Sequence, residues 1–421
     1  MRRCRRARAA FLWLVPLLVC AEATYAQVEI GGFGQVNYAT RVTGAPCPSP
    51  TACDFLLGEE RLQLKLEAFS ESGSAAFASR IDFYHDAVVN EPGIEVREIY
   101  IDLTSEHAGL RVGRQIVTWG TGDLVFINDT FPKDWVAFFT GRPLEYLKVG
   151  SDALTIDLYP GFLDAEIVFV PFFQPDRYPT GARLILFDPL PPALPRRLEQ
   201  KERSWENTEI SAKLSRYVSD WEVAAYASRG FFRTPAASLG EEGPQPELRL
   251  SFPRLNTYGA SARGGLWAGV LSIEGGYYDS VEDREGDDPA AENSQIKGLV
   301  GYNHALWRDA TLGVQAFVEW MRHDSHRDSL LPGFPAREAV RWTVTTRFTQ
   351  RLSYQTITLS LFAFWGLTEH DALLIPSIRY AFSDALWAEL GSNIFLARNP
   401  WTTFGVLDRN DSVYLTLRYG F

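Results

Sequence analysis

The sequence predicts an all-β chain that forms a transmembrane antiparallel β-barrel of about 18 strands, with 16 strands as the alternative. Three observations predict this fold: an export signal at the N-terminus, a C-terminal strand that alternates apolar and polar residues to the last position, and a series of such strands joined by alternately long and short connections. The predicted organisation is a signal peptide at residues 1–26 and a single barrel domain at residues 27–421.

The N-terminus has the three parts of a secretory signal peptide. Five arginines precede an apolar run from about Ala9 to Cys20, and small residues follow up to Ala26. The run is too short to span a bilayer as a mature helix. We expect cleavage after Ala26, so that the mature chain begins near Gln27. Lipoprotein processing at Cys20 fits less well, because the bulky Val19 stands where a small residue is required.

Two of the four cysteines remain after the signal is removed. Cys47 and Cys53 lie in the Pro-rich loop GAPCPSPTACD. In an exported protein, two cysteines this close in one loop predict a local disulfide. Such a bond would hold one loop rather than the whole fold.

The C-terminal segment SVYLTLRYGF has a strict two-residue period. Its apolar members are Val413, Leu415, Leu417, Tyr419 and Phe421. A closed barrel can end in this way, because its last strand pairs with its first and leaves no free edge. The ending resembles the C-terminal strand of bacterial outer-membrane β-barrels, which finishes on an aromatic residue recognised by the barrel-assembly machinery. The resemblance implies the outer membrane of a Gram-negative cell, with its lipid and lipopolysaccharide as surroundings.

Composition agrees with a membrane barrel. The 421 residues include 13% aromatic and 22% charged side chains, and no apolar run after the signal reaches the length of a membrane helix. A barrel tolerates this balance, because half of each strand faces a polar interior. The formal net charge of −11 argues against a nucleic-acid partner.

Period-two segments follow one another along the mature chain. They lie at residues 28–41, 59–70, 75–85, 94–103, 109–119, 151–159, 163–172, 206–218, 221–231, 254–264, 267–279, 295–305, 310–322, 339–350, 354–366, 373–382, 385–396 and 412–421. Their connections alternate between short and long, which is typical of periplasmic turns and outer loops. Pro376 interrupts one segment, and this leaves the 16-strand alternative open.

The alternation also assigns faces to single strands. In EERLQLKLEAF, Leu62 and Leu64 would face lipid, whereas Arg61 would face the lumen. The segment 339–350 places Arg341 and Arg347 inward by the same rule. The lumen is therefore expected to be polar and mixed in charge, as a water-filled channel requires.

The long connection at residues 120–150 is expected to fold into the barrel and narrow it. Gly120 and Gly122 let the backbone leave the wall sharply, and the segment that follows is too apolar to extend into water. It is the third outer loop of this chain, and in general porins the third outer loop constricts the lumen. Asp123, at its start, is therefore a pore-lining candidate.

The preceding strand, GRQIVTWG, resembles a strand of outer-membrane barrels of the alginate-export and porin-like kind. The resemblance implies that Arg114 lies in the constriction, whereas alternation groups Arg111 with Gln115 on the opposite face. An arginine that faces lipid at mid-bilayer costs about 2–4 kcal/mol. This cost favours a β-bulge near Gly113, and both arginines stay candidates.

These features predict a porin-like channel for the diffusion of small hydrophilic solutes. The pore-lining candidates are Arg111, Arg114, Gln115, Asp123, Arg341 and Arg347. One alternative is an exporter of an anionic polysaccharide, but the predicted lumenal carboxylates would repel such a polymer. Another is a channel for hydrophobic compounds that uses the apolar loop 173–205. A homotrimer is expected because porins of this size are often trimers.

Catalytic and cofactor motifs are missing from the sequence. The turn GTGD lacks the Lys-Ser/Thr ending of a phosphate-binding loop, and there is no G-x-S-x-G, H-E-x-x-H or C-x-x-C-H motif. We therefore predict a protein that is not an enzyme and that uses no cofactor or metal.

Overall fold

The computed structural model describes residues 27–44, 55–188, 190–191, 194–240, 246–288, 291–323 and 338–421. The predicted signal peptide and the cysteines Cys47 and Cys53 lie outside the described residues.

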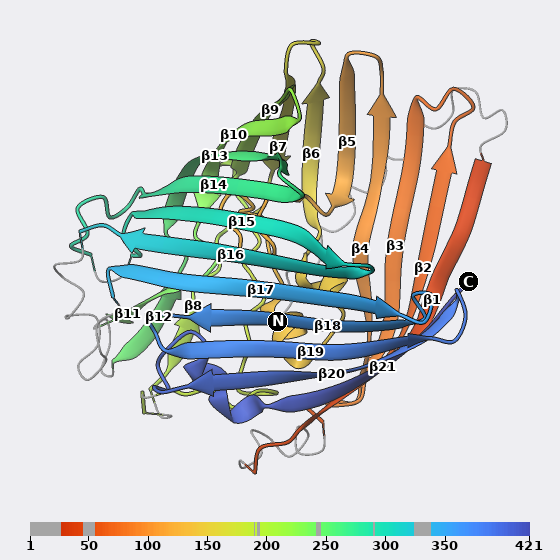
Figure 1. Cartoon of the computed structure of the whole chain (residues 1–421). Helices are drawn as coiled ribbons and strands as arrows, with labels where there is room; N and C mark the ends of the chain where they lie inside the picture. Colours follow the sequence, from red (N-terminus) through yellow and green to blue (C-terminus); the bar gives the residue numbers. More distant parts are fainter. Residues whose placement is uncertain are drawn as a thin grey trace, which may run out of the picture.

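Eighteen antiparallel strands form one closed barrel (Figure 1). They are β1 Gln27–Arg41, β2 Leu57–Phe69, β3 Ala75–Asp86, β4 Glu91–Thr104, β5 Ala108–Gln115, β6 Ser151–Leu158, β7 Asp164–Val170, β9 Glu209–Val218, β10 Trp221–Phe231, β13 Arg254–Leu266, β14 Gly269–Ser280, β15 Gln295–Trp307, β16 Ala310–Met321, β17 Val340–Leu352, β18 Ile357–Gly366, β19 Asp371–Ala381, β20 Leu386–Ala397 and β21 Ser412–Gly420. The predicted fold class, with its long outer loops and short turns, is confirmed.

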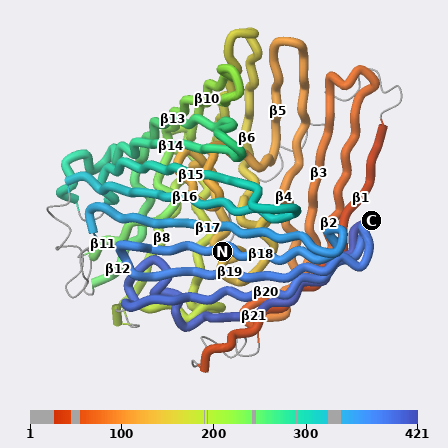
Figure 2. Tube along the Cα trace, in the orientation of Figure 1, coloured from red at the N-terminus to blue at the C-terminus, as the bar shows by residue number. Residues whose placement is uncertain are grey.

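The first and last strands close the ring. β1 pairs with β21 from Phe33 opposite Gly420 to Arg41 opposite Ser412, and with β2 on its other side. Figure 2 shows the red start of the chain beside its blue end. The closure leaves no free sheet edge, which satisfies the backbone of both terminal strands.

The 16-strand alternative is wrong, because Pro376 lies inside β19. It pairs with Leu361 of β18, whereas the β20 register passes from Leu374 directly to Ser377. Proline has no backbone N–H, so it interrupts one ladder without ending the strand.

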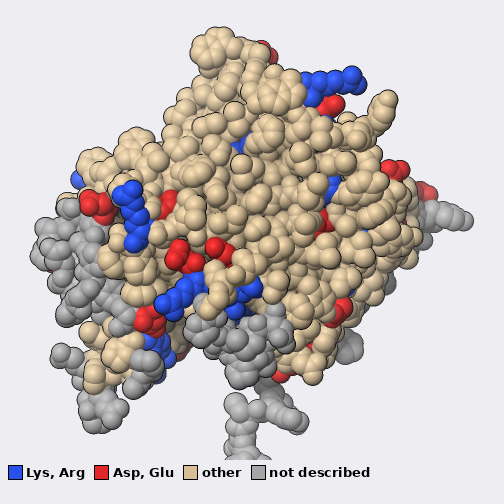
Figure 3. All heavy atoms as spheres, turned by 60° about the horizontal axis from the view of Figure 1, so that its bottom comes forward, with Lys and Arg blue, Asp and Glu red and all other residues tan. Residues whose placement is uncertain are grey.

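Alternation sets the two faces of the wall. Leu62 and Leu64 of β2 are 42% and 41% exposed on the outside, whereas Arg61, which directly precedes Leu62, is 4% exposed. Charged side chains occupy only a small part of the face shown in Figure 3. The exposed apolar side chains thus form the surface that a bilayer requires.

A register irregularity occurs in β4 and not in β5. Arg80 pairs with Glu98 but Ile81 with Val96, so the β3–β4 register shifts at Arg97. The predicted bulge near Gly113 is wrong, because β5 pairs continuously with both of its neighbours.

The long loops carry the remaining elements. These are a three-stranded sheet of β8 Arg196–Leu198, β11 Ala236–Gly240 and β12 Glu247–Ser251, the helix α1 Trp135–Thr140, and the 3-10 turns η2 Leu144–Leu147, η3 Trp205–Asn207 and η5 Gly405–Asn410. In Figure 1 the small sheet lies near the left ends of β17–β19, on the side of the long loops. Across the described segments, no helix has the length and apolar character needed to cross a membrane.

Candidate constriction and outer cavity

The segment 116–150 between β5 and β6, here called the lumenal loop, is bonded to the inner wall at Glu274 of β14. This carboxylate is 2% exposed. It accepts hydrogen bonds from Thr121 N at 2.6 Å, Thr121 Oγ1 at 3.1 Å, Gly122 N at 3.1 Å, and Asn128 N and Nδ2 at 2.9 Å each. One buried charge therefore fixes the whole turn from 121 to 128.

Glycines in the wall make room for this turn. A Cβ added at Gly259 of β13 would lie 1.8 Å from Asn128 Oδ1, and one added at Gly276 of β14 would lie 2.7 Å from Ile127 Cγ2. Ile127 is fully buried. The loop can thus approach the wall this closely because glycine has no side chain at these two wall positions.

The far side of the loop is bonded to the opposite wall. Asn393 Nδ2 of β20 donates to Phe139 O at 2.9 Å, and Asn37 Nδ2 of β1 donates to Gly141 O at 3.1 Å. In an 18-strand ring, β1 lies almost opposite β14. The lumenal loop therefore crosses the barrel from wall to wall.

Ion pairs continue this second attachment. Arg142 Nη2 lies 2.8 Å from Glu59 Oε2, and Glu59 Oε1 lies 2.7 Å from Arg61 Nε. The Arg61 guanidinium is centred 4.7 Å from the ring of Tyr84 and 4.6 Å from the ring of Tyr146. Glu59 and Arg61 are both nearly inaccessible, so removal of one partner would leave a buried charge.

Two of the predicted site residues meet at the start of the loop. Arg347 of β17 pairs with Asp123 through both Nε and Nη2, with 2.8 Å from Nη2 to Oδ1. Their side chains are 35% and 36% exposed, unlike the buried pairs at the far wall. The next residue, Leu124, has a φ of 59°, which is unfavourable for a residue with a side chain. Among the described ion pairs between the lumenal loop and the barrel wall, this is the one in which both side chains are more than a third exposed.

Arg111 and Gln115 lie on the lumenal face of β5. Arg111 Nε donates to Asp102 Oδ2 at 2.9 Å, and its guanidinium lies 4.8 Å from the centre of the Tyr100 ring. Gln115 is 2% exposed and donates to Ala153 O at 3.1 Å.

Arg114 lies on the other face of β5. It pairs with Asp152, at 2.7 Å from Nε to Oδ1, and its neighbour across the sheet is Ile99, which is 41% exposed. The resemblance predicts that Arg114 lies in the constriction. The structure differs, because β5 has no bulge and strand alternation therefore places Arg114 on the outer face.

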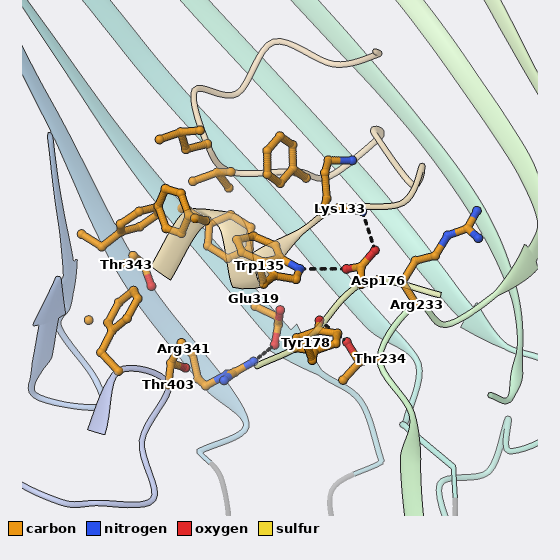
Figure 4. Close-up of a pocket in the computed structure, with 18 of the residues that line it drawn as sticks. Lys133, Trp135, Asp176, Tyr178, Arg233, Thr234, Glu319, Arg341, Thr343 and Thr403 are labelled. Carbon is orange, nitrogen blue, oxygen red and sulfur yellow. Dashed lines mark hydrogen bonds and ion pairs between the residues drawn. The ribbon is translucent and has the colours of Figure 1, made fainter. Parts of the chain in front are cut away.

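An outer cavity of about 660 Å³ lies between the lumenal loop, the outer loops and the inner wall (Figure 4). Aromatic side chains dominate its lining: Phe126, Phe131, Trp135, Phe138, Phe139, Tyr178, Phe231, Phe232, Tyr278, Phe317, Phe364, Trp401 and Phe404. Such concave sites with a few charged groups are typical ligand pockets.

The apolar loop predicted at 173–205 contributes to this cavity. Asp176, Tyr178 and Leu186 line it, and Leu184 is fully buried in the hydrophobic cluster beneath. Asp176 accepts hydrogen bonds from Trp135 Nε1 and Lys133 N, each at 2.8 Å (Figure 4). The two outer loops are therefore held together at one end of the cavity.

The ionisable groups at that end are strongly buried. Lys133 Nζ donates to Asp129 Oδ1 at 2.8 Å and to Phe131 O at 2.6 Å, and burial lowers the pKa of Lys133. Burial raises the pKa of Asp176. Both shifts have the same cause, which is the loss of water around a charge.

A chain of charges lines the other end of the cavity. Lys297 Nζ lies 3.3 Å from Glu319 Oε2, Glu319 pairs with the predicted residue Arg341, and Arg341 Nη1 lies 3.0 Å from Glu369 Oε1. Glu369 also accepts a hydrogen bond from Thr403 N at 2.8 Å.

Part of this chain of charges could be predicted from the sequence. Strand alternation in 310–322 places Glu319 inward, whereas Glu369 lies in a short loop and has no such signal. Among the described residues, no group of three or more His, Cys, Asp or Glu side chains could hold a metal ion.

Comparison with known proteins identifies the fold. No family model matches the chain, and no curated protein sequence matches it. The structure of Pseudomonas aeruginosa OccD3 (OpdP) is similar, with a TM-score of 0.56 and 9% identity over 94% of this chain and 91% of that one. Pseudomonas aeruginosa OccK11 (OpdR) gives a TM-score of 0.51 and 9% identity over 94% and 96%.

The fold is that of outer-membrane porin-like barrels. OmpF of Salmonella typhi also matches, over 94% of this chain and 97% of that one, with a TM-score of 0.45 and 9% identity. At these identities the likeness concerns the fold alone.

Proposed function

We propose that this chain is a porin-like channel of the Gram-negative outer membrane, through which small solutes diffuse past the lumenal loop. The observation that carries the proposal is a closed 18-strand barrel whose third outer loop is bonded to two opposite walls. An apolar outer face and a polar lumen suit a barrel that contacts outer-membrane lipid and lipopolysaccharide. No catalytic activity is part of the proposal.

Deletion of residues 123–140 tests the constriction. We expect the single-channel conductance in planar bilayers to rise, because the deletion removes Asp123, α1 and Phe139, which is one of the residues bonded to the far wall. Glu106→Ala, in an exposed periplasmic turn, is the control and should conduct like the wild type. A sealed barrel with no conductance in either the wild type or the deletion variant would refute the channel.

A second candidate is passage of hydrophobic compounds, and the apolar lining of the outer cavity favours it. Leu186 lines the cavity, whereas Leu198, further along the same loop, is 46% exposed. If apolar solutes use the cavity, Leu186→Asn should slow the uptake of an apolar fluorescent probe into proteoliposomes, and Leu198→Asn should not. Equal uptake in both variants would exclude this route.

The export of an anionic polysaccharide is not favoured by the lumen. Carboxylates such as Asp102, which is paired with Arg111, stand on the lumenal face and interrupt the basic ladder that a polyanion needs. The sequence resemblance to alginate-export barrels stays a prediction.

The proposal includes a homotrimer. Its support is a polar cluster on the lipid side of the wall, where His85 Nδ1 lies 2.9 Å from Glu60 Oε2 and Tyr38 Oη also donates to Glu60. Neighbours on that face include Leu62 and Phe83, which are 42% and 40% exposed. Contact with a second copy would shield these polar groups. Native mass spectrometry should give three chains per particle, and a monomer at all detergent concentrations would contradict it.

A further inference from the structure

We propose that the outer cavity binds small aromatic solutes that carry a positive charge, of the arylalkylamine class, with the ammonium group at the Glu319–Glu369 end. The inference rests on the proposed channel function, because it names the solute that the channel would select.

The size and walls of the cavity fit an aromatic ring. Its volume of about 660 Å³ lies within the range of sites for small molecules. The rings of Phe364 and Phe404 are 5.5 Å apart, those of Phe138 and Phe364 are 6.1 Å apart, and Trp135 stacks on Phe139 at 6.0 Å. A further ring could pack among these faces without losing a hydrogen bond.

The charges at the two ends of the cavity differ. At the Trp135 end, the lining carboxylates Asp129 and Asp176 are matched by the two cations Lys133 and Arg233.

At the opposite end, four described carboxylates line the cavity against two cations. They are Glu292, Glu319, Glu369 and Asp371 against Lys297 and Arg341. Among the described residues, Lys297 and Arg341 form ion pairs with Glu319 and Glu369 and not with Asp371. A cation beside Asp371 would therefore be stabilised in this mostly apolar surrounding.

Both cations at this end are already engaged. Arg341 bridges Glu319 and Glu369, and Lys297 pairs with Glu319 while its ammonium lies 4.0 Å from the centre of the Tyr278 ring. A carboxylate ligand would have to break one of these buried pairs, which leaves a charge uncompensated. The site therefore disfavours anionic solutes.

An acceptor at this end lacks a partner. Asp371 is 6% exposed, lines the cavity, and its Oδ1 has no hydrogen-bond partner among the described residues, whereas Oδ2 accepts from Phe404 N at 2.8 Å. An ammonium group beside Glu369 and Asp371 would supply donors and charge together. Nearby rings add cation–π attraction.

Calorimetric titration of the purified barrel in lipid nanodiscs tests the proposal with three probes. 2-Phenylethylamine has both the ring and the charge, 3-phenylpropionate has the ring with the opposite charge, and butylamine has the charge without the ring. We expect 2-phenylethylamine to bind about tenfold or more tightly than either of the others, since tenfold corresponds to about 1.4 kcal/mol. Equal or tighter binding of 3-phenylpropionate would overturn the proposal.

Two variants and a control locate the site. Glu369→Gln keeps an acceptor for Thr403 N but removes a charge, and Phe364→Leu removes a ring. Each should weaken binding of 2-phenylethylamine about fivefold or more, by loss of charge attraction or of cation–π contact. Glu282→Gln, in an exposed part of an outer loop, should bind like the wild type. Unchanged binding in both cavity variants would refute the site even if the amine binds elsewhere.

Conductance of the same preparations separates this inference from the channel itself. A barrel that conducts ions but does not distinguish the three probes contradicts only the cavity assignment. A barrel that binds the amine but never conducts contradicts only the channel.

Discussion

At the scale of single residues, the carboxylate of Glu274 is the most heavily used group that joins the lumenal loop to the wall. Glu274→Gln should detach the turn 121–128, because an amide offers one acceptor oxygen and no charge to the donors on Thr121, Gly122 and Asn128. Hydrogen bonds to a charged group contribute about 1.5–3 kcal/mol each. Hydrogen exchange of residues 120–128 should become faster, with Glu282→Gln as the exposed control. Unchanged protection of the turn would mean that other contacts hold it.

Gly259 gives a second prediction at this scale. Gly259→Ala should displace Asn128, because the new Cβ would lie 1.8 Å from its Oδ1 and 2.6 Å from Gly275 O. The steric cost is about 1–3 kcal/mol. Gly275→Ala is the matched control, since its Cβ would meet nothing closer than 3.8 Å. Mobility of the lumenal loop, measured by limited proteolysis, should rise in the first variant only. Equal cleavage in both would exclude a role for close approach at Gly259.

At the scale of elements, the joint between the lumenal loop and β17 is the exposed Asp123–Arg347 pair. Arg347→Ala should free the start of the loop and increase current fluctuations in single-channel records, because both side chains of this pair are partly exposed, whereas the attachments at Glu274 and Glu59 are buried. An exposed pair contributes only about 0–1 kcal/mol, so the remaining anchors should keep the loop in the barrel. Arg351→Ala, which removes another charge from the same strand, is the control. Identical records from the wild type and Arg347→Ala would exclude the joint as a weak point.

The elements differ in how far the sequence predicts them. Each of the 18 barrel strands was predictable, because two-residue alternation is local and every barrel strand turns one face to lipid and the other to the lumen. The three short strands β8, β11 and β12 in the loops were not predicted. β5 shows the limit: the pattern continues to 119, but the strand ends at Gln115, after which Ile116 N donates to Glu98 Oε1. That contact depends on Glu98 of β4, whose position beside Ile116 cannot be predicted from a local sequence pattern.

The candidate site was predictable only in part for the same reason. Arg341, Arg347 and Asp123 follow from parity and loop order, and the structure places each beside a charged partner. The outer cavity, which Arg341 lines, is made by loops far apart in sequence, through contacts such as Asp176 with Trp135. Loop positions depend on such long-range contacts and not on periodicity.

At the scale of the whole molecule, the barrel is held closed by the seam between β1 and β21. The last residue takes part: Gly32 N donates to Phe421 O and Phe421 N donates to Gly32 O, each at 3.0 Å. Phe421 itself is 58% exposed, so its ring adds little packing within the described chain. The seam would lose two backbone hydrogen bonds without it, about 1–3 kcal/mol in total.

Deletion of Phe421 should therefore affect assembly in cells more than stability. Residues 27–420, which lack Phe421, should refold into lipid vesicles with a small loss of stability, because the pairs from Phe33 to Arg41 with β21 are retained. In cells we expect much less barrel in the outer membrane, since the chain would lose the terminal aromatic residue that, by its resemblance to other outer-membrane barrels, we predict the assembly machinery to recognise. Phe382→Ala, which removes a 60% exposed ring from a periplasmic turn, is the control and should assemble normally. Equal loss in refolding and in cells would show that Phe421 acts through the seam alone.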